Sequence, residues 1–327
     1  MQLLRGRTGN VETLAVSPDS RFVVAAGEYS NCHVWDLSDA KSKPRKLLSD
    51  AAYFSTAPHP PQDDPTAPRE LLSDTVNFSM LGFATATSLL GRVGGNCWRC
   101  DLAAQTQTEV AFPRAASKYE AILHPSGELF KACSLNGRRI LTVHVVEGEL
   151  ETVGSGTKAS SVPNLYAISP DGSRYLVRES YPADMRRGCH IRDTATDRVV
   201  ATFDQPAGWM LFESAPWAFT PDGRRALVAA SHHVLVYDCD AGGPPVLTLP
   251  HPVPGGLFNA LAVHPDGRRV ATVEDHRTVT LRDADTLQPL RCYDFAMPRV
   301  TCVAFTPDGT RCAVGNSRGK VLLFDVD

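Results

Sequence analysis

The chain has 327 residues, 43% of them hydrophobic and 21% charged, with a formal net charge of −3. This composition allows a large buried core, and its charge balance gives no reason to expect a nucleic acid or an acidic membrane as a partner. No stretch approaches the roughly 18 apolar residues that span a bilayer, and the first residues lack the apolar core of a secretory signal. The nine cysteines form an odd set without a framework spacing, so we expect reduced thiols and a cytoplasmic protein.

A turn motif recurs along the chain, in most intervals about every 45 residues. Its common form is Pro-Asp-Gly preceded by Ser, Thr or His, and its copies begin at Ser17, His124, Ser169, Thr220, His264 and Thr306. Proline presets φ at the second turn position, Asp is tolerated at the third, and Gly accepts the positive φ that returns the chain as a hairpin. A short apolar strand precedes most copies, as in Leu14-Ala15-Val16. Each copy therefore predicts two strands joined by a tight turn.

A second signature follows each hairpin, an alternating strand that in most copies ends in Asp. The copies are Trp35-Asp36, Cys100-Asp101, Arg192-Asp193, Tyr237-Asp238, Arg282-Asp283 and Phe324-Asp325, with Val145-Val146 as a degenerate seventh. The spacing matches the roughly 40–45 residues of one propeller blade in every interval but the first. In that interval the Pro-rich residues 56–69 predict a surface insertion that is dispensable for folding. The sequence thus predicts an all-β protein, a single seven-bladed β-propeller over residues 1–327.

The two ends of the chain complement each other. The last copy stops at Asp327, just after its third strand, and leaves no sequence for a fourth. The spare segment Gln2-Leu3-Leu4-Arg5 is similar to Lys46-Leu47-Leu48, which we assign to the outer strand of the first blade. We therefore expect the N-terminal strand to pair with the last blade and to close the ring, which removes an exposed sheet edge.

These repeats resemble those of the bacterial WD40 propellers over essentially the whole chain. The resemblance lies in the Trp35-Asp36 dipeptide, in the Pro-Asp-Gly turns and in the first repeat, Leu4 to Val16, where Arg7 stands at the position of the usual His. No Gly-His dipeptide occurs, so the family's buried network of Asp, His, Ser/Thr and Trp is expected to be absent and the blades to be held mainly by apolar packing. The resemblance implies an interaction scaffold without a cofactor.

The cysteines and histidines have structural explanations. Cys97 and Cys100 form a CxxC motif, but residues three apart on a strand point to opposite faces and cannot share a metal. Cys32, Cys97 and Cys189 occupy a repeat position that is Val in other blades, which predicts reduced core residues. One position on the third strand is shared by His33, His144 and His190, and we expect these side chains to pack between blades rather than to act in catalysis.

A ring of polar residues is expected at the start of the innermost strands. Its members are Glu12, Asn77, Tyr119, Asn164, Ala215, Asn259 and Thr301. The resemblance places this position at the mouth of the central channel. Its amides and carboxylate are compatible with a hard cation, as in calcium-dependent lactonases, although polar residues are ordinary at this position and only one carries a sure negative charge.

The loops on the same face carry side chains of the types that dominate binding hot spots. Those predicted to contact a partner are Trp209, Met210, Tyr181, Arg187, Phe258 and Arg299, together with Glu12, Asn77, Asn164 and Asn259 from the ring. An alternative is that Trp209 and Phe212 only close the loops onto the core.

The predicted function is therefore a non-enzymatic scaffold that binds a protein or peptide of unknown identity on the channel face. No catalytic, cofactor-binding or metal-binding residues are assigned, because the sequence has no nucleophile elbow, phosphate loop or clustered carboxylate pair. We expect no nucleic acid or membrane as a partner, and a monomer by itself. The alternative is a propeller enzyme of the lactonase or hydrolase kind with a divalent cation at the channel mouth.

Overall fold

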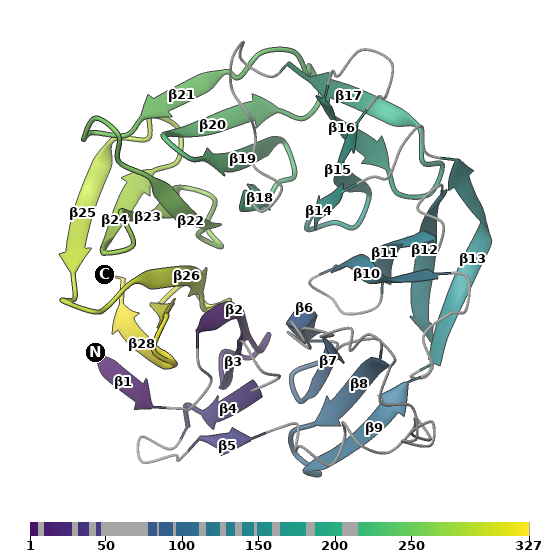
Figure 1. Cartoon of the computed structure of the whole chain (residues 1–327), viewed down its shortest axis with the longest axis horizontal. Coiled ribbons are helices and arrows are strands. Elements are labelled where there is room, and N and C mark those ends of the chain that lie inside the picture. Colours follow the sequence, from purple (N-terminus) through teal and green to yellow (C-terminus); the bar gives the residue numbers. More distant parts are fainter. Residues whose placement is uncertain are drawn as a thin grey trace, which may run out of the picture.

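The computed structural model arranges the chain as seven four-stranded antiparallel sheets around a central axis (Figure 1). It describes residues 1–5, 10–27, 32–38, 44–46, 78–83, 85–93, 96–110, 116–124, 129–134, 139–146, 149–158, 164–180, 187–204 and 215–326. The Pro-rich residues 56–69 lie outside these ranges. The seven-bladed propeller predicted from the repeats is confirmed.

Each blade has strands a to d, numbered from the axis outward. Blade one holds β2 (Val11–Val16), β3 (Phe22–Gly27), β4 (Cys32–Asp36) and β5 (Arg45–Lys46). Blade two holds β6 (Phe78–Phe83), β7 (Ser88–Val93), β8 (Asn96–Asp101) and β9 (Thr106–Val110). Blade three holds β10 (Ala116–Leu123), β11 (Leu129–Ser134), β12 (Arg139–Val146) and β13 (Glu149–Lys158). Blade four holds β14 (Asn164–Ile168), β15 (Arg174–Ser180), β16 (Arg187–Asp193) and β17 (Val199–Phe203).

The remaining blades follow the same plan. Blade five holds β18 (Trp217–Phe219), β19 (Arg225–Ala230), β20 (His233–Asp238) and β21 (Leu247–Pro250). Blade six holds β22 (Phe258–Val263), β23 (Arg269–Glu274), β24 (Thr278–Asp283) and β25 (Pro289–Asp294). Blade seven holds β26 (Val300–Phe305), β27 (Arg311–Asn316), β28 (Lys320–Asp325) and, as strand d, β1 (Gln2–Arg5).

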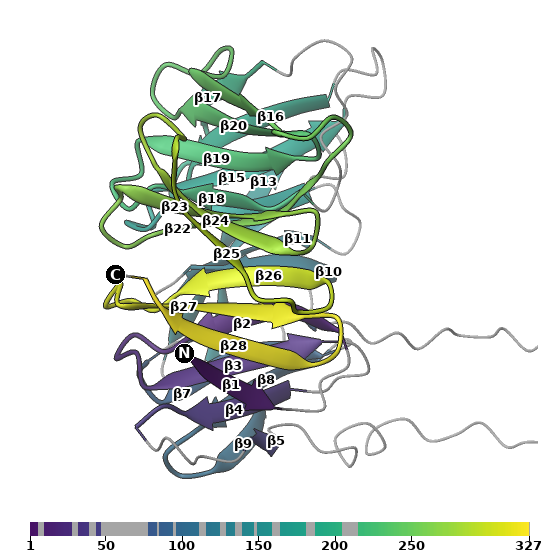
Figure 2. The same cartoon turned by 90° about the vertical axis from the view of Figure 1, so that its left-hand side faces the viewer.

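Strand β1 closes the ring as the sequence predicts. It pairs antiparallel with β28, with Leu4 opposite Val321 and Gln2 opposite Leu323, and both views of the molecule show the two strands side by side (Figures 1 and 2). Leu4 is buried in a cluster with Val23 and Trp35 of blade one. The N-terminal strand therefore both covers a sheet edge and fills the seam between the last and first blades.

The Pro-Asp-Gly motif forms the a–b turn of each blade in which it is described. In blade seven the Thr306 hydroxyl donates to Asp308 at 2.6 Å and accepts from the Arg311 amide at 3.0 Å. Gly309 has a φ of +71°, which a residue without a Cβ adopts at no steric cost. The turn thus satisfies its own polar groups, and the chain leaves it already in register for strand b.

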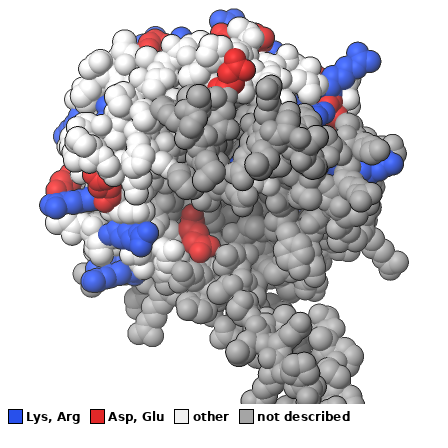
Figure 3. All heavy atoms as spheres, turned by 45° about the horizontal axis from the view of Figure 1, so that its top comes forward, with Lys and Arg blue, Asp and Glu red and all other residues white. Residues whose placement is uncertain are grey.

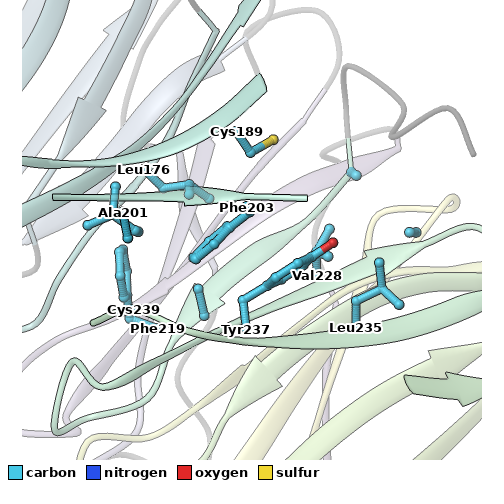
Figure 4. Packing of buried hydrophobic residues seen from close by; sticks show 13 residues of the cluster. Leu176, Cys189, Ala201, Phe203, Phe219, Val228, Leu235, Tyr237 and Cys239 are labelled. Atoms are coloured by element: carbon cyan, nitrogen blue, oxygen red, sulfur yellow. The ribbon is translucent and has the colours of Figure 1, made fainter. Parts of the chain in front are cut away.

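Apolar packing joins neighbouring blades. Between blades four and five the cluster in Figure 4 includes Phe203 and Tyr237, whose rings stack with centroids 4.4 Å apart, and Leu176 and Cys189. Trp35 is also buried, and its indole N–H has no hydrogen-bond partner among the described residues. An indole N–H without a partner is in keeping with the predicted loss of the family's buried polar network.

Polar contacts between blades add to this packing, so the expectation of mainly apolar seams is incomplete. Lys131 on β11 is fully buried, and its Nζ lies 2.7 Å from both the Asp197 carboxylate and the Thr194 carbonyl of blade four. The Tyr175 hydroxyl donates to the same carboxylate at 3.0 Å. Burial lowers the pKa of the Lys131 ammonium, and the neighbouring Asp197 opposes this shift. A buried ion pair thus spans the seam between blades three and four.

Exposed ion pairs near the a–b turns also join neighbouring blades. Arg174 of blade four lies 2.7 Å from Asp240 of blade five, and Arg225 of blade five lies 2.8 Å from Asp285 of blade six. Figure 3 shows positive and negative side chains next to each other at several places on the described surface. Because these pairs are exposed, each adds little to stability on its own.

Candidate binding face

The functional candidates belong to one face of the disc, which we call the upper face. It carries the d–a loops and the b–c turns, whereas the a–b and c–d turns lie on the opposite, lower face, because strands alternate in direction within each blade. On the upper face the structure describes the b–c turns of blades five, six and seven and the d–a loops at 251–257 and 295–299.

Four members of the predicted ring, Glu12, Asn164, Asn259 and Thr301, lie in the first two positions of strands a, as expected, whereas Tyr119 is the fourth residue of β10 and Ala215 precedes β18. The side-chain oxygen of Asn259 accepts from the backbone amide of His276 at 2.6 Å. The side-chain nitrogen of Asn259 lies 3.0 Å from Nε2 of the His276 ring. The Thr301 hydroxyl donates to the carbonyl of Val11 in the neighbouring blade. Glu12 and Asn164 are half-buried, Ala215 is buried, the Tyr119 side chain is not described, and Asn77 lies outside the described residues.

These contacts weaken the case for a cation at the channel mouth. The side-chain oxygens of Asn259 and Thr301 are held by protein hydrogen bonds, which a metal would have to replace. Within the described ranges, no three His, Cys, Asp or Glu side chains are grouped so that they could hold a metal ion. Thr301 thus links blade seven to blade one, whereas Asn259 holds the b–c turn of its own blade.

The predicted loop contacts divide into four groups, the last of which is Arg299, described below. Trp209, Met210 and Tyr181 lie outside the described residues. Arg187 begins β16 opposite Ser180, but its side chain is not described. Phe258 is 3% exposed and packs edge-on against the ring of His251, so its side chain is unavailable to a partner and its assignment to the binding surface is withdrawn.

The 251–257 loop, between blades five and six, presents apolar side chains to solvent. Val253 is 55% exposed and Leu257 is 37% exposed, and Pro252 and Pro254 are exposed as well. The sequence predicts Phe258 as the contact residue. The structure instead exposes its neighbour Leu257 and buries Phe258. Val253 was missed, although the Pro-Val-Pro-Gly-Gly run around it is a surface-loop signal.

Hydrogen bonds to both neighbouring b–c turns hold this loop in place. The His251 amide donates to the His232 carbonyl at 2.7 Å, and the His232 ring lies 2.6 Å from the Gly256 carbonyl. The Leu257 amide donates to the Asp275 carboxylate at 2.8 Å, and its carbonyl accepts from the Asp275 amide. A Cβ at Gly256 would overlap the His251 ring. The loop is therefore built as a fixed projection.

Basic side chains follow along the upper face toward blade seven. Arg299 is exposed, has a φ of +28°, and has one guanidinium nitrogen 3.4 Å from the His276 ring. Its carbonyl accepts from the Ser317 amide at 2.9 Å, which places it beside Arg318 in the next b–c turn. Arg299 is thus the predicted contact residue whose described side chain lies on the exposed upper face, and Arg318 is a neighbour that the sequence analysis did not identify.

The cysteines lie where the repeat predicts them. Cys32 and Cys189 are buried without a bridge, and burial raises the pKa of the Cys189 thiol to about 12 and that of Cys32 well above its usual value. The Cys97 side chain is not described. His33 and His190 are buried as expected, whereas His144 is exposed, so the prediction for His144 is wrong.

Comparisons with known proteins agree with this architecture. Over its full length the chain is similar to the crystal structure of the β-propeller domain of Cps50 (Swd1) from Myceliophteria thermophila, with a TM-score of 0.70 and 16% sequence identity, covering 99% of this chain and 98% of that one. The fold that the two chains share is the β-propeller. The family model for the WD domain, G-beta repeat, matches residues 1–36 and 288–325 and supports the WD40 family.

The residues that match the family model lie on both sides of the seam where the propeller closes. They span β1 to β4 and β25 to β28, and so include strands a to c of the first blade and all four strands of the last. No curated protein matches the sequence. Among the described residues no helix is long and apolar enough to cross a membrane.

Proposed function

We propose that this WD40 propeller is a non-enzymatic scaffold that binds a protein or peptide segment on its upper face, with the 251–257 loop as the apolar contact. The observation that carries the proposal is that this loop exposes apolar side chains while hydrogen bonds hold its backbone in place. Val253 and Leu257 face solvent, yet the backbone between them is tied to the b–c turns of blades five and six.

This combination favours binding because the loop loses little conformational freedom when a partner covers it. A loop whose only role is to join two strands has no need to expose two branched apolar side chains, and grouped exposed apolar residues with a charged surround mark interaction surfaces. The charged residues Asp275 and Arg277 of the next turn supply such a surround. The fold is compatible with a scaffold but does not by itself establish one.

The test is site-specific photo-crosslinking in the native cell. A photoreactive residue at Leu257 should give discrete crosslinks to a partner protein, and the matched position Leu290, an exposed leucine on strand β25 of the rim, should not. Purified partner should then bind the wild-type chain at least about tenfold more tightly than the Leu257→Asp variant, since one buried apolar contact accounts for an energy of that order.

The stability of the variant serves as the control. Because Leu257 is partly exposed, Leu257→Asp should melt within a degree or two of wild type. Equal crosslinking at 257 and 290, or equal partner affinity of Leu257→Asp and wild type, would show that the upper face is not the binding surface.

A further inference from the structure

We infer that the segment bound at the upper face is rich in Asp and Glu, and that Arg299 and Arg318 receive its carboxylates beside the 251–257 loop. The inference rests on the proposed function and specifies the chemistry of the partner. It is carried by the placement of the two arginines, by the way their backbone is fixed and by the absence of an ion pair between either of them and a carboxylate of the described residues.

The two arginines lie in different loops whose backbones are joined by a hydrogen bond. Arg299 ends the d–a loop before β26, and Arg318 lies in the b–c turn between β27 and β28. The hydrogen bond from the Ser317 amide to the Arg299 carbonyl joins these segments. Since Arg318 follows Ser317 directly, two guanidinium groups are presented from adjacent backbone positions, and both residues are exposed.

The backbone under both side chains is fixed. Asn316 is 0% exposed, and its carboxamide oxygen accepts from the amides of Arg318 at 3.0 Å and Lys320 at 2.9 Å. Arg299 is held at a φ of +28°, a region that residues with a side chain rarely occupy, while the next residue, Val300, is bonded through its amide to the His276 carbonyl. Backbone strain of this kind persists where the surrounding structure enforces it and is concentrated at functional positions.

The charges of Arg299 and Arg318 are not neutralised within the described part of the chain. The neighbouring Arg277 is paired with Asp294 at 2.9 Å, but Arg299, Arg318 and Lys320 have no carboxylate partner there. Asp275 is already engaged by the Leu257 amide. A local positive surplus thus stands on a chain whose formal net charge is −3.

This arrangement suits carboxylates on a peptide. Guanidinium groups bind carboxylates through paired N–H donors, and two of them on a preorganised backbone bind without a large entropic cost. The apolar side chains Val253 and Leu257 lie one blade away along the same face. A partner segment with an apolar residue followed by acidic residues would therefore satisfy both parts of the surface, and the positive surplus would also accelerate its association.

The experiment uses the full-length chain and fluorescein-labelled peptides in an anisotropy titration. One probe alternates Leu with Glu, and its isosteric counterpart alternates Leu with Gln. The test variant is Arg299→Gln/Arg318→Gln, the charge-retaining variant is Arg299→Lys/Arg318→Lys, and the matched control is Arg198→Gln/Arg268→Gln, two exposed arginines on the lower face. All four proteins should melt at similar temperatures because every substituted side chain is on the surface.

The Glu peptide should bind wild type at least about tenfold more tightly than the Gln peptide, and the preference should weaken as salt is raised. The Arg299→Gln/Arg318→Gln variant should lose the preference, the Lys variant should keep part of it, and the lower-face control should keep all of it. Equal binding of the two peptides, or an intact preference in the Arg299→Gln/Arg318→Gln variant, would overturn the inference. A single-stranded RNA that competes as well as the Glu peptide would overturn it too, because it would show polyanion binding alone.

The outcome is separable from that of the proposed function. If crosslinks at Leu257 identify a partner whose bound segment is neutral or basic, the scaffold function holds and the acidic preference fails. If the Glu peptide binds through Arg299 and Arg318 but no protein crosslinks at Leu257, the charge recognition holds and the apolar contact of the proposed function fails.

Discussion

The buried ion pair between blades three and four makes a sharp prediction about stability. Replacing Lys131 with Met keeps a chain of similar length but removes the ammonium that faces the Asp197 carboxylate, the Thr194 carbonyl and the Thr142 hydroxyl. The carboxylate then stays buried without the ammonium that balances its charge, and the Tyr175 hydroxyl still donates to its Oδ1 atom. Removing one partner of a buried ion pair costs about 3–5 kcal/mol, chiefly because the other charge is left uncompensated.

The same reasoning gives the size of the expected shift in melting temperature. With an unfolding entropy of about 2 cal/mol/K per residue, a chain of 327 residues should lose about 4–7 °C in Lys131→Met. The double variant Lys131→Met/Asp197→Asn removes the uncompensated charge and leaves only lost hydrogen bonds, of about 1–2 kcal/mol. Asn also tolerates the φ of +56° at position 197. The second substitution should therefore restore about 3 °C or more.

Differential scanning calorimetry at neutral pH measures all three proteins. The control is Asp240→Asn, which breaks the exposed pair with Arg174 between blades four and five and should shift the melting temperature by no more than about 1 °C. A Lys131→Met protein as stable as wild type, or a double variant no more stable than the single one, would contradict the assignment of Lys131 as the charge partner of Asp197.

Three further predictions concern the closure, the thiols and the turns. Leu4→Ala should lower the free energy of unfolding, measured in urea, by about 2–4 kcal/mol because Leu4 is buried against the neighbouring blade. Leu3→Ala, at an exposed position of the same strand, should leave the free energy of unfolding nearly unchanged. Equal losses in the two variants would refute the closure. In the native protein iodoacetamide should modify the exposed Cys292 and leave Cys189 unmodified until denaturant is added, as measured by peptide mass spectrometry. Hydrogen bonds from the hydroxyls of Ser169 and then Ser173 lower the pKa of Asp171 to about 2, below its unfolded value of about 3.9. The contribution of Asp171 to stability is therefore present above about pH 4 and is lost as the pH falls toward 2. Asp171→Asn should reduce this acid-induced loss, and an unchanged acid profile would show that the turn carboxylate does not contribute.

The sequence is a good guide to the architecture because the repeats are local. A Pro-Asp-Gly turn specifies its own backbone geometry, so the period of the turns predicts the period of the blades. Pairing of Gln2–Arg5 with the last blade is predicted in the same way, because this segment is similar to Lys46-Leu47-Leu48, the predicted outer strand of the first blade. The structure confirms this pairing, with Leu4 opposite Val321.

The candidate site was less predictable because it depends on which of two neighbouring residues faces outward. Leu257 and Phe258 are equally apolar in the sequence, and the hydrogen bonds of Leu257 with Asp275 and of Phe258 with Ser231 decide that the first is exposed and the second buried. The interblade pair of Lys131 and Asp197 was likewise hidden, since 66 residues separate the partners. Contacts of this kind arise only when neighbouring blades pack against each other, and no local pattern encodes them.

The first residue of the a–b turn has two different roles. Where it is Ser or Thr, its hydroxyl bonds within its own turn, as Thr220 does with Asp222. Where it is His, the ring also reaches the next blade, and His264 Nε2 lies 2.8 Å from the Gly309 carbonyl of blade seven. A Cβ at Gly309 would lie 2.7 Å from the His264 ring, whereas a Cβ at Gly223 would meet only the Ser169 Cβ at 3.9 Å.

These two glycines therefore provide a matched test of the histidine contact. Both have a φ near +70°, so Gly309→Ala and Gly223→Ala carry the same backbone strain. Only Gly309→Ala must also displace the His264 ring, so its loss of unfolding free energy, measured in urea, should exceed that of Gly223→Ala by about 1–3 kcal/mol. In a His264→Thr background the extra cost should vanish, because a threonine returns this turn to the self-contained form. If the two alanine variants are equally unstable, or if the difference persists without the histidine, His264 does not connect blades six and seven.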